Sequence, residues 1–322
     1  MEFRNLKHTD LRVSRISFGT MTFGSQVDEA TARRMVDRCL DAGVNFFDTA
    51  NIYNKGEAET ILGKALIGKR DKVIVASKVR GKMGDSPGES GLSHAAIRKA
   101  IDASLKRLGT DHVDLYYLHQ PDYDVPIEET LGAISDLVHE GKVRYPAVSN
   151  YAAWQVAEIF CTSERKGYSP PRISQPMYNL LARNIEEEYV PFCKRFAVAM
   201  VPYNPLAGGL LTGKYRDQNV KSGGRFDSNT MYQDRYWHDD YFAAVDELSR
   251  IARDAGKTLV ALSLQWLLSQ PHVDSVILGA SRLEQLEENL KACESGRLEE
   301  DTIARCDNVW KRLRGITPKY NR

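Results

Sequence analysis

The feature that most constrains the fold of this chain is a repeated alternation of short apolar runs with longer helical segments. Eight runs rich in β-branched residues recur, mostly about 30 residues apart. These runs are Val13–Phe18, Val44–Phe47, Val73–Ala76, Val113–Leu118, Val143–Val148, Ile173–Ser174, Ala197–Val201 and Ser275–Leu278. Such spacing indicates repeated βα units. An open doubly wound sheet could hold them, but eight units favour an α/β fold of the closed (β/α)₈ TIM-barrel type.

Helix boundary signals agree with this alternation. Asp28 can cap a helix that ends at Ala42–Gly43. Ser93 can cap a second helix that ends at Leu108–Gly109, where the glycine is suited to the left-handed residue that closes a helix. We therefore expect helices between the first and second strands and between the third and fourth strands.

Two segments depart from the regular alternation. Met1–Leu11 is typical of a short polar hairpin, with Thr9–Asp10 as its turn residues. Leu206–Asp239, after the seventh strand, is rich in Gly, Lys, Arg and Tyr and has no clear periodicity. A connection of that length inside a compact domain usually has a function, as a lid or a binding loop. No linker composition divides the chain, so we expect one domain over residues 1–322.

Composition excludes several classes of function. The 322 residues include 44 Lys and Arg and 43 Asp and Glu, and the formal net charge of +1 gives no basis for bulk binding of nucleic acid or anionic membrane. No stretch approaches the roughly 18 apolar residues of a transmembrane helix, and residues 1–5 lack a signal-peptide core. We expect the chain to be cytoplasmic, with buried thiols and neither disulfides nor a metal site, at Cys39, Cys161, Cys193, Cys293 and Cys306.

Polar side chains fall at the ends of three consecutive predicted strands. Asp48 ends the second strand, Lys78 the third and His119 the fourth, while Tyr53 lies in the loop after the second. In a parallel barrel these strand ends open onto one face, where barrel enzymes place their active sites. One polar strand end is unremarkable, but four chemically compatible groups predict a catalytic site.

Several longer motifs accompany these residues in order along nearly the whole chain. They are Gly43–Ala50, Ser77–Lys78, Asp114–His119, Val148–Asn150, Gln175–Asn179, Tyr203–Tyr215 and Leu278–Arg282. With them the chain resembles the aldo-keto reductases. The segment Gly208–Tyr215 is most similar to the branch that contains the potassium-channel β subunits and related bacterial reductases. The resemblance implies the same (β/α)₈ barrel that the alternation predicts.

The resemblance also implies a reaction, in which a hydride passes from NADPH to an aldehyde or ketone carbon. Tyr53 would be the general acid and base, and His119 would hydrogen-bond the carbonyl oxygen. We expect the Lys78 ammonium to lower the pKa of Tyr53 from its ordinary value near ~10, and Asp48 to keep Lys78 charged and oriented. The substrate would be a small carbonyl compound or alcohol.

The cofactor site implied by the resemblance can be placed by the chemistry of each part. Ser149, Asn150 and Gln175 suit the nicotinamide carboxamide, and Tyr203 offers a stacking plane. We expect Thr20 and Asp48 near the ribose, and Lys214 and Arg225 near the pyrophosphate. Ser281, Arg282 and Gln285 would bind a 2′-phosphate, which favours NADP over NAD. Glu288 and Asn289 would face the adenine. The helix that would hold the 2′-phosphate runs from Arg282 to Ala292. The expected cofactor site is completed by residues of the neighbouring loops, namely Gly19, Met21, Asn204, Pro205, Leu206, Gly208 and Gly279.

The chain departs from the family pattern in two places. Pro146, in Tyr145–Ala147, is unexpected in a central strand, and a bulge there would shift Ser149 and Asn150. After Tyr53, the segment Asn54–Glu59 has less glycine than is common in relatives. We also expect aromatic pocket surface from three loops, at Phe23, Tyr123, Tyr232, Tyr236 and Trp237.

Two other functions compete with a reductase. The first is a nucleotide-binding regulatory subunit that senses redox state with little catalysis. His119 favours an enzyme over this reading, since such subunits can carry Asn there. The second is a non-reductase barrel, such as an isomerase or lyase.

Overall fold

The computed structural model describes residues 1–215, 224–227, 229–294 and 297–318. The strands are β1 Phe3–Asn5, β2 Arg12–Ser14, β3 Ile16–Gly19, β4 Phe46–Asp48, β5 Ile74–Val79, β6 Val113–Leu118, β7 Val143–Ser149, β8 Ile173–Gln175, β9 Ala199–Met200 and β10 Val276–Gly279. The α-helices are α1 Glu29–Asp41, α2 Glu57–Ala65, α3 His94–Leu108, α4 Ile127–His139, α5 Ala153–Lys166, α6 Tyr189–Arg195, α7 Thr230–Tyr236, α8 Asp239–Asp254, α9 Leu259–Ser269, α10 Leu283–Glu294 and α11 Glu300–Arg314. Short 3₁₀ turns are η1 Tyr53–Gly56, η2 Arg70–Lys72, η3 Asn184–Glu186 and η4 Ala207–Thr212.

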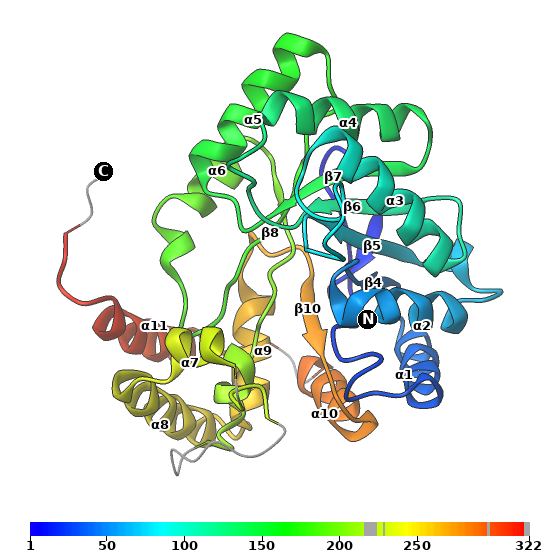
Figure 1. Cartoon of the computed structure of the whole chain (residues 1–322). Helices are drawn as coiled ribbons and strands as arrows, with labels where there is room; N and C mark the ends of the chain where they lie inside the picture. The colour runs from blue at the N-terminus through cyan, green and yellow to red at the C-terminus, as the bar shows by residue number, and fades with distance from the viewer. Residues whose placement is uncertain (216–223, 228, 295–296, 319–322) are drawn as a thin grey trace.

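Eight of the strands form one parallel sheet that curls into a barrel. Its order is β10-β3-β4-β5-β6-β7-β8-β9, and helices lie around the outside of the strands (Figure 1). The two end strands are joined through the residues that flank them, by backbone hydrogen bonds from Asp274 N, just before β10, to Met200 O at 2.9 Å and from Ile277 N to Pro202 O, just after β9, at 3.0 Å. The predicted (β/α)₈ barrel is therefore confirmed.

The N-terminal hairpin closes the amino-terminal end of the barrel. β1 pairs antiparallel with β2, and Leu6, Leu11 and Val13 are buried in the same apolar cluster as the inward-facing strand residues. The remaining members of that cluster include Phe46, Ile74, Leu115, Ala147, Ile173, Ala199 and Ile277. A second cluster fills the space between strands and helices. Each strand therefore buries both faces, which explains why the runs read as continuous apolar stretches.

The predicted hairpin is confirmed, but the predicted bounds of the first barrel strand are wrong. The run Val13–Phe18 is divided, because Val13 and Ser14 belong to β2 and the barrel strand begins at Ile16. Ser14 Oγ donates to Ile16 O at 2.6 Å across the break, and Arg15 N donates back to Glu2 O. An apolar run alone does not show where a chain leaves one sheet and enters another.

Pro146 causes no bulge. It lies opposite Tyr116 of β6, and the register between β6 and β7 keeps one offset from Val113–Val143 to Leu118–Val148. Ser149 therefore still ends its strand in regular register with Gln175 of β8.

The structure confirms the two helix caps predicted from the sequence. Asp28 accepts a hydrogen bond from Thr31 N at 2.7 Å, and Ser93 accepts one from Ala96 N at 3.3 Å. Gly109 ends α3 with φ +64°.

Two other expectations need correction. Within the long segment, α7 is regular helix, whereas residues 216–223 and 228 lie outside the described residues. Not every thiol is buried, because Cys161 is exposed on α5 and Cys293 is partly exposed. The helix α5 presents Cys161 on its solvent side, a placement that the cysteine count does not reveal.

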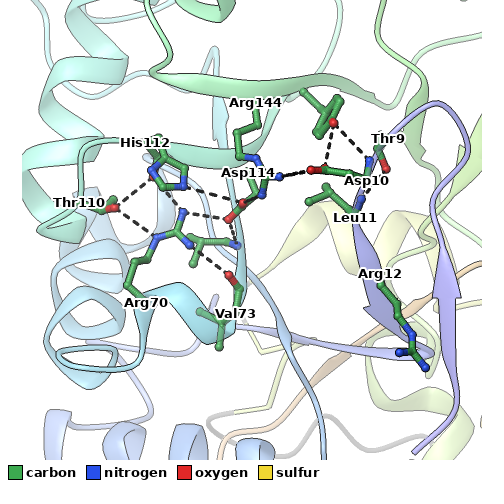
Figure 2. A network of polar contacts seen from close by, with 12 residues as sticks. Thr9, Asp10, Leu11, Arg12, Arg70, Val73, Thr110, His112, Asp114 and Arg144 are labelled. Carbon is green, nitrogen blue, oxygen red and sulfur yellow. Dashed lines mark hydrogen bonds and ion pairs between the residues drawn. The ribbon is translucent and has the colours of Figure 1, made fainter.

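A polar network ties the hairpin to the amino-terminal ends of the strands (Figure 2). Asp114 of β6 accepts hydrogen bonds from Arg144 Nη1 at 2.6 Å and from Val75 N at 2.9 Å, and it forms an ion pair with Arg70 Nη2 at 2.9 Å. Arg144 of β7 also donates to Asp10 in the hairpin turn, at 2.8 Å. Asp114 is 1% exposed, whereas the Asp10 side chain is 67% exposed.

This difference in burial predicts unequal effects on stability. Asp114→Ala should lower the free energy of unfolding by about 3 kcal/mol, because it leaves two guanidinium groups without their shared buried carboxylate. Asp10→Ala should lower it by about 1 kcal/mol or less, because an exposed ion pair is screened by water. Urea unfolding of both variants measures these values, and equal losses would contradict the assignment of Asp114 as the centre of the network.

Candidate active site

The four predicted catalytic residues meet at the carboxyl ends of neighbouring strands. Asp48 is the last residue of β4, Lys78 is next to last in β5, and His119 directly follows β6. Tyr53 begins η1, in the connection between β4 and α2. The strand register places these ends side by side, with Asp48 opposite Ala76 and Lys78 opposite Tyr117.

Lys78 is fully buried, and its ammonium finds three oxygen acceptors. Nζ donates to Asp48 Oδ1, to Thr49 O at 2.8 Å and to the Tyr53 hydroxyl at 3.3 Å. An ammonium group has three donors, so all of them are used. The other carboxylate oxygen, Asp48 Oδ2, accepts from Gln175 Nε2 at 2.8 Å. The buried ion pair is therefore completed by hydrogen bonds on both sides, which offsets the cost of desolvating it.

The charges in this pair follow from burial and from the partners. Burial raises the pKa of Asp48, and the nearby Lys78 and Gln175 act against that rise. Burial alone would lower the pKa of Lys78, but Asp48 and Tyr53 outweigh it and raise that pKa above its ordinary value. Lys78 is therefore an ammonium at neutral pH.

The expected lowering of the pKa of Tyr53 is wrong. Burial of the hydroxyl raises this pKa above its ordinary value, and the opposing effect of Lys78 is smaller. The expectation considered the neighbouring charge and left out desolvation, which acts in the opposite direction on a phenol. Tyr53 is therefore a protonated phenol at neutral pH, with its oxygen already in contact with a cation.

His119 lies with its ring centroid 6.0 Å from that of Tyr53, edge to face. Burial lowers its pKa to about 3, and the charges of Lys78 and Arg80 add to the effect. The imidazole is therefore neutral and offers one N–H donor. Sequence reasoning missed Arg80, although a second basic residue two positions beyond Lys78, at the same strand end, was a usable signal.

The residues predicted for the carboxamide form a continuous chain with this site. Ser149 Oγ donates to Gln175 O at 2.9 Å, and Asn150 Nδ2 donates to His119 O at 2.8 Å. The Tyr203 hydroxyl donates to Asn150 Oδ1 at 2.8 Å. Since Gln175 also donates to Asp48, the structure brings these predicted residues together beside the four predicted catalytic residues.

The loop after β3 borders the same site. Thr20 is fully buried, and both its N and its Oγ1 donate to Asp48 O, at 2.9 and 3.1 Å. Gly19 lies opposite both Asp48 and Gly279 in the sheet, and Met21 is 38% exposed. Thr20 therefore holds the strand end, while Met21 presents surface.

The predicted residues after β9 divide into buried and accessible ones. Asn204, at φ +62°, accepts from Gly208 N at 2.7 Å and donates to the Tyr236 hydroxyl at 2.8 Å. Pro205 is buried and Leu206 is half-buried. Asn204 and Pro205 therefore stabilise the conformation of the loop after β9.

The two cations predicted for the pyrophosphate contact aromatic rings. Lys214 Nζ lies 4.9 Å from the ring centroid of Tyr215, and Arg225 Nη1 donates to the Tyr232 hydroxyl at 3.1 Å. The segment 216–223 between them lies outside the described residues.

The helix predicted for the 2′-phosphate begins one residue later than expected, at Leu283. Ser281 N and Oγ both donate to Gln285 Oε1, at 2.9 and 3.0 Å, and Arg282 is exposed beside them. A hydroxyl, a guanidinium and the first turn of a helix form a donor set that fits a phosphate. Gln285 orients Ser281 in this arrangement.

Gly279 and the next turn of α10 complete this region. The position that a Gly279 Cβ would take is open space, so another molecule can approach the backbone there. Asn289 is buried and donates to Gly279 O at 3.3 Å, whereas Glu288 is exposed. Asn289 therefore holds the end of β10 through its hydrogen bond to Gly279.

The expected aromatic pocket surface is wrong in part. Phe23 and Tyr236 are fully buried core residues, and Tyr232 is 7% exposed. Tyr123, at 81% exposed, does present its ring on the surface. An aromatic residue in a loop often packs against the hydrophobic core, because burying its ring removes apolar surface from water.

Two absences apply to the part of the chain that the structure describes. No group of three or more His, Cys, Asp or Glu side chains there is arranged to hold a metal ion. No described helix combines the length and the apolar character needed to cross a membrane.

Comparison with known proteins agrees with this geometry. The model of the aldo/keto reductase family matches residues 15–311. The chain is 39% identical over 322 residues to human aldo-keto reductase family 7 member A3, covering 94% of this chain and 96% of the relative. It is 38% identical over 322 residues to human aflatoxin B1 aldehyde reductase member 2, covering 94% and 88%. It is also 38% identical over 299 residues to a probable voltage-gated potassium channel subunit beta of Oryza sativa subsp. japonica, covering 91% of each. The chain therefore belongs to the aldo/keto reductase family.

Proposed function

We propose that this protein is an NADP(H)-dependent oxidoreductase that reversibly reduces an aldehyde, ketone or sugar carbonyl to the alcohol. The observation that carries the proposal is the 3.3 Å contact between the buried Lys78 ammonium and the Tyr53 hydroxyl. It joins a proton donor to a fixed positive charge. The names of the two human relatives, a reductase and an aldehyde reductase, support the same chemistry.

When bound, NADPH supplies the hydride for the carbonyl carbon, and the protein's own residues handle the proton. Tyr53, a protonated phenol, gives its proton to the carbonyl oxygen and becomes a phenolate. Lys78 stabilises that phenolate, because its ammonium already lies at the phenolic oxygen. Asp48 holds the ammonium in place throughout. In the reverse direction the phenolate takes the proton of the alcohol.

His119 acts on the same oxygen without exchanging a proton. Because its pKa is about 3, it stays neutral and can donate one N–H hydrogen bond to the carbonyl. The bond orients the substrate oxygen toward Tyr53 and polarises the carbonyl.

The cofactor residues take the roles that their chemistry allows. Ser149, Asn150 and Gln175 would hold the carboxamide, and the ring of Tyr203 would lie against the nicotinamide. Ser281 and Arg282 would bind the 2′-phosphate at the start of α10, which selects NADP over NAD. The hydrogen bond between the Tyr203 hydroxyl and the Asn150 side chain supports this assignment, because it holds the Tyr203 ring next to a residue proposed to bind the carboxamide.

A second function, a nucleotide-binding regulatory subunit, is favoured by one observation. The rice relative is named as a probable channel subunit. The complete set of Asp48, Tyr53, Lys78 and His119 favours the enzyme. A panel of carbonyl compounds assayed at 340 nm decides between them, since a subunit would bind NADPH tightly and turn over none of the panel.

The first prediction of this mechanism concerns Tyr53. Tyr53→Phe should lower kcat by about 10²- to 10⁴-fold, the usual contribution of a general acid. The dissociation constant for NADPH should stay within about twofold, because the hydroxyl acts on the substrate. Steady-state kinetics and fluorescence titration measure the two quantities. Wild-type kcat in the variant would refute the mechanism.

The second prediction concerns pH. Protonated Tyr53 and neutral His119 are the forms that reduction needs. The pKa of Tyr53 is above its ordinary value and that of His119 is about 3, so both forms persist between about pH 5 and pH 8. The pH profile of kcat/KM for reduction should therefore be flat over this range. A limb near pH 6.5 would show that His119 titrates as an ordinary imidazole.

The third prediction concerns the cofactor. NADPH should bind at least about tenfold more tightly than NADH, because one hydrogen bond to a charged group is worth roughly 1.5–3 kcal/mol. Arg282→Ala should remove most of that difference. Glu284→Ala, on the same first turn but with no predicted contact to the phosphate, is the control. Equal wild-type affinities for the two cofactors would refute the phosphate site.

A further inference from the structure

The turn that follows Tyr53 has a strained backbone. Asn54 and Lys55 adopt φ values of +49° and +53°, and Gly56 continues the turn at +93°. The left-handed conformation costs a non-glycine residue about 1 kcal/mol or more, although asparagine tolerates it better than lysine. Tyr53 is thus carried by a bend that local preference does not maintain, and other contacts must hold it.

The side chain of Asn54 makes such contacts. Its Nδ2 donates to Phe23 O at 2.5 Å, with Met21 O at 3.2 Å and Ser25 Oγ at 3.3 Å also within reach. All three partners belong to the loop after β3. A carboxamide nitrogen has two hydrogens, so these oxygens saturate it.

The loop that receives Asn54 is firmly anchored. Phe23 is fully buried, and Phe23 N donates to Thr20 O at 2.9 Å. Thr22 Oγ1 donates to Ala280 O at 2.7 Å, which joins the loop to the end of β10. A Cβ on Gly24 would lie 2.6 Å from Glu57 Cγ, so the loop also packs closely on the first turn of α2.

Lys55 offers a direct contrast. It has nearly the same backbone conformation as Asn54, but its side chain is exposed. Among the described residues, the Lys55 side chain forms no hydrogen bond or ion pair, while its backbone N donates to Ile52 O at 3.2 Å. Of the two strained residues, only Asn54 has a side chain that holds the bend.

We propose that Asn54 is a positioning residue, which fixes the Tyr53 hydroxyl against Lys78 by tying the bend to the loop after β3. The proposal rests on the proposed function of Tyr53. Of the three Nζ contacts, that with Tyr53 is the longest, at 3.3 Å, and it alone depends on η1. Thr49 and Asp48 lie in or beside β4 and keep their contacts when the bend moves. A small displacement of Tyr53 therefore separates the proton donor from its stabilising cation.

The experiment compares Asn54→Gly with Lys55→Gly. Both variants place glycine at a left-handed position, so both relieve backbone strain and add similar freedom to the unfolded chain. Only the first removes the contacts with the loop after β3. Asn54→Gly should lower kcat by about tenfold to hundredfold, the usual effect of a misplaced catalytic group. Lys55→Gly should keep the wild-type kcat.

Two further measurements separate positioning from a general loss of structure. The thermal midpoint of Asn54→Gly should lie only a few degrees below that of Lys55→Gly, because hydrogen bonds worth about 1 kcal/mol are lost, and the two variants should bind NADPH with closely similar affinity. In the protein without cofactor, hydrogen exchange over residues 50–58 should be faster in Asn54→Gly than in Lys55→Gly. Asn54→Asp, which tolerates the same backbone but cannot donate to carbonyl oxygens, should behave as Asn54→Gly does.

The outcomes are distinct. Equal kcat values and equal exchange rates in the two glycine variants would overturn the role of Asn54 and leave the proposed function standing. If the folded fraction of Asn54→Gly at the assay temperature falls by the same factor as its kcat, the role of Asn54 is overturned as well, because the loss would then be one of stability. A wild-type protein with no turnover on any carbonyl compound would overturn the proposed function, and the role of Asn54 with it.

Discussion

An ammonium group enclosed away from water needs three acceptors, and the carboxyl end of this barrel is organised around the three that Lys78 finds. Asp48 and Thr49 come from β4 and the residue after it, and Tyr53 from the connection beyond. Gln175, from the far side of the barrel, completes Asp48. Lys78 and its three acceptors come from the neighbouring strands β4 and β5 and the connection after β4, whereas the contact of Gln175 with Asp48 spans the barrel from β8. The position of the ammonium is therefore set by one strand pair, and that of its carboxylate partner by the closed barrel as well.

The sequence predicted the architecture and the central residues well, because both depend on patterns that burial imposes. Strands buried on both faces read as apolar runs, and polar residues at strand ends then stand out. Even Pro146, which looked like a disruption, fits into β7 in unbroken register. The division of Val13–Phe18 between two sheets was missed, because an apolar run does not encode its partner.

The properties that the sequence could not supply depend on competition between opposing effects. The pKa of Tyr53 is set by burial against the charge of Lys78, and only the folded surroundings decide that burial is larger. Phe23 and Tyr236 were expected on the surface of the pocket, whereas loop packing places both in the core. The segment Asn54–Glu59 stood out for its low glycine content, but the contacts of Asn54 could not be predicted, because its partners are oxygens about 30 residues earlier in the chain.

The saturation of Lys78 has a consequence for chemical selectivity. A neutral lysine amine condenses with aldehydes to form an imine, and an aldehyde brought to Tyr53 would come within reach of such an amine. Here the nitrogen stays protonated, and each of its hydrogens is held by an oxygen, so it has no lone pair with which to attack. The same three contacts that make Lys78 useful to a phenolate keep it from becoming a nucleophile. In the proposed reaction, a reactive carbonyl compound would therefore be reduced beside a lysine without being trapped by it.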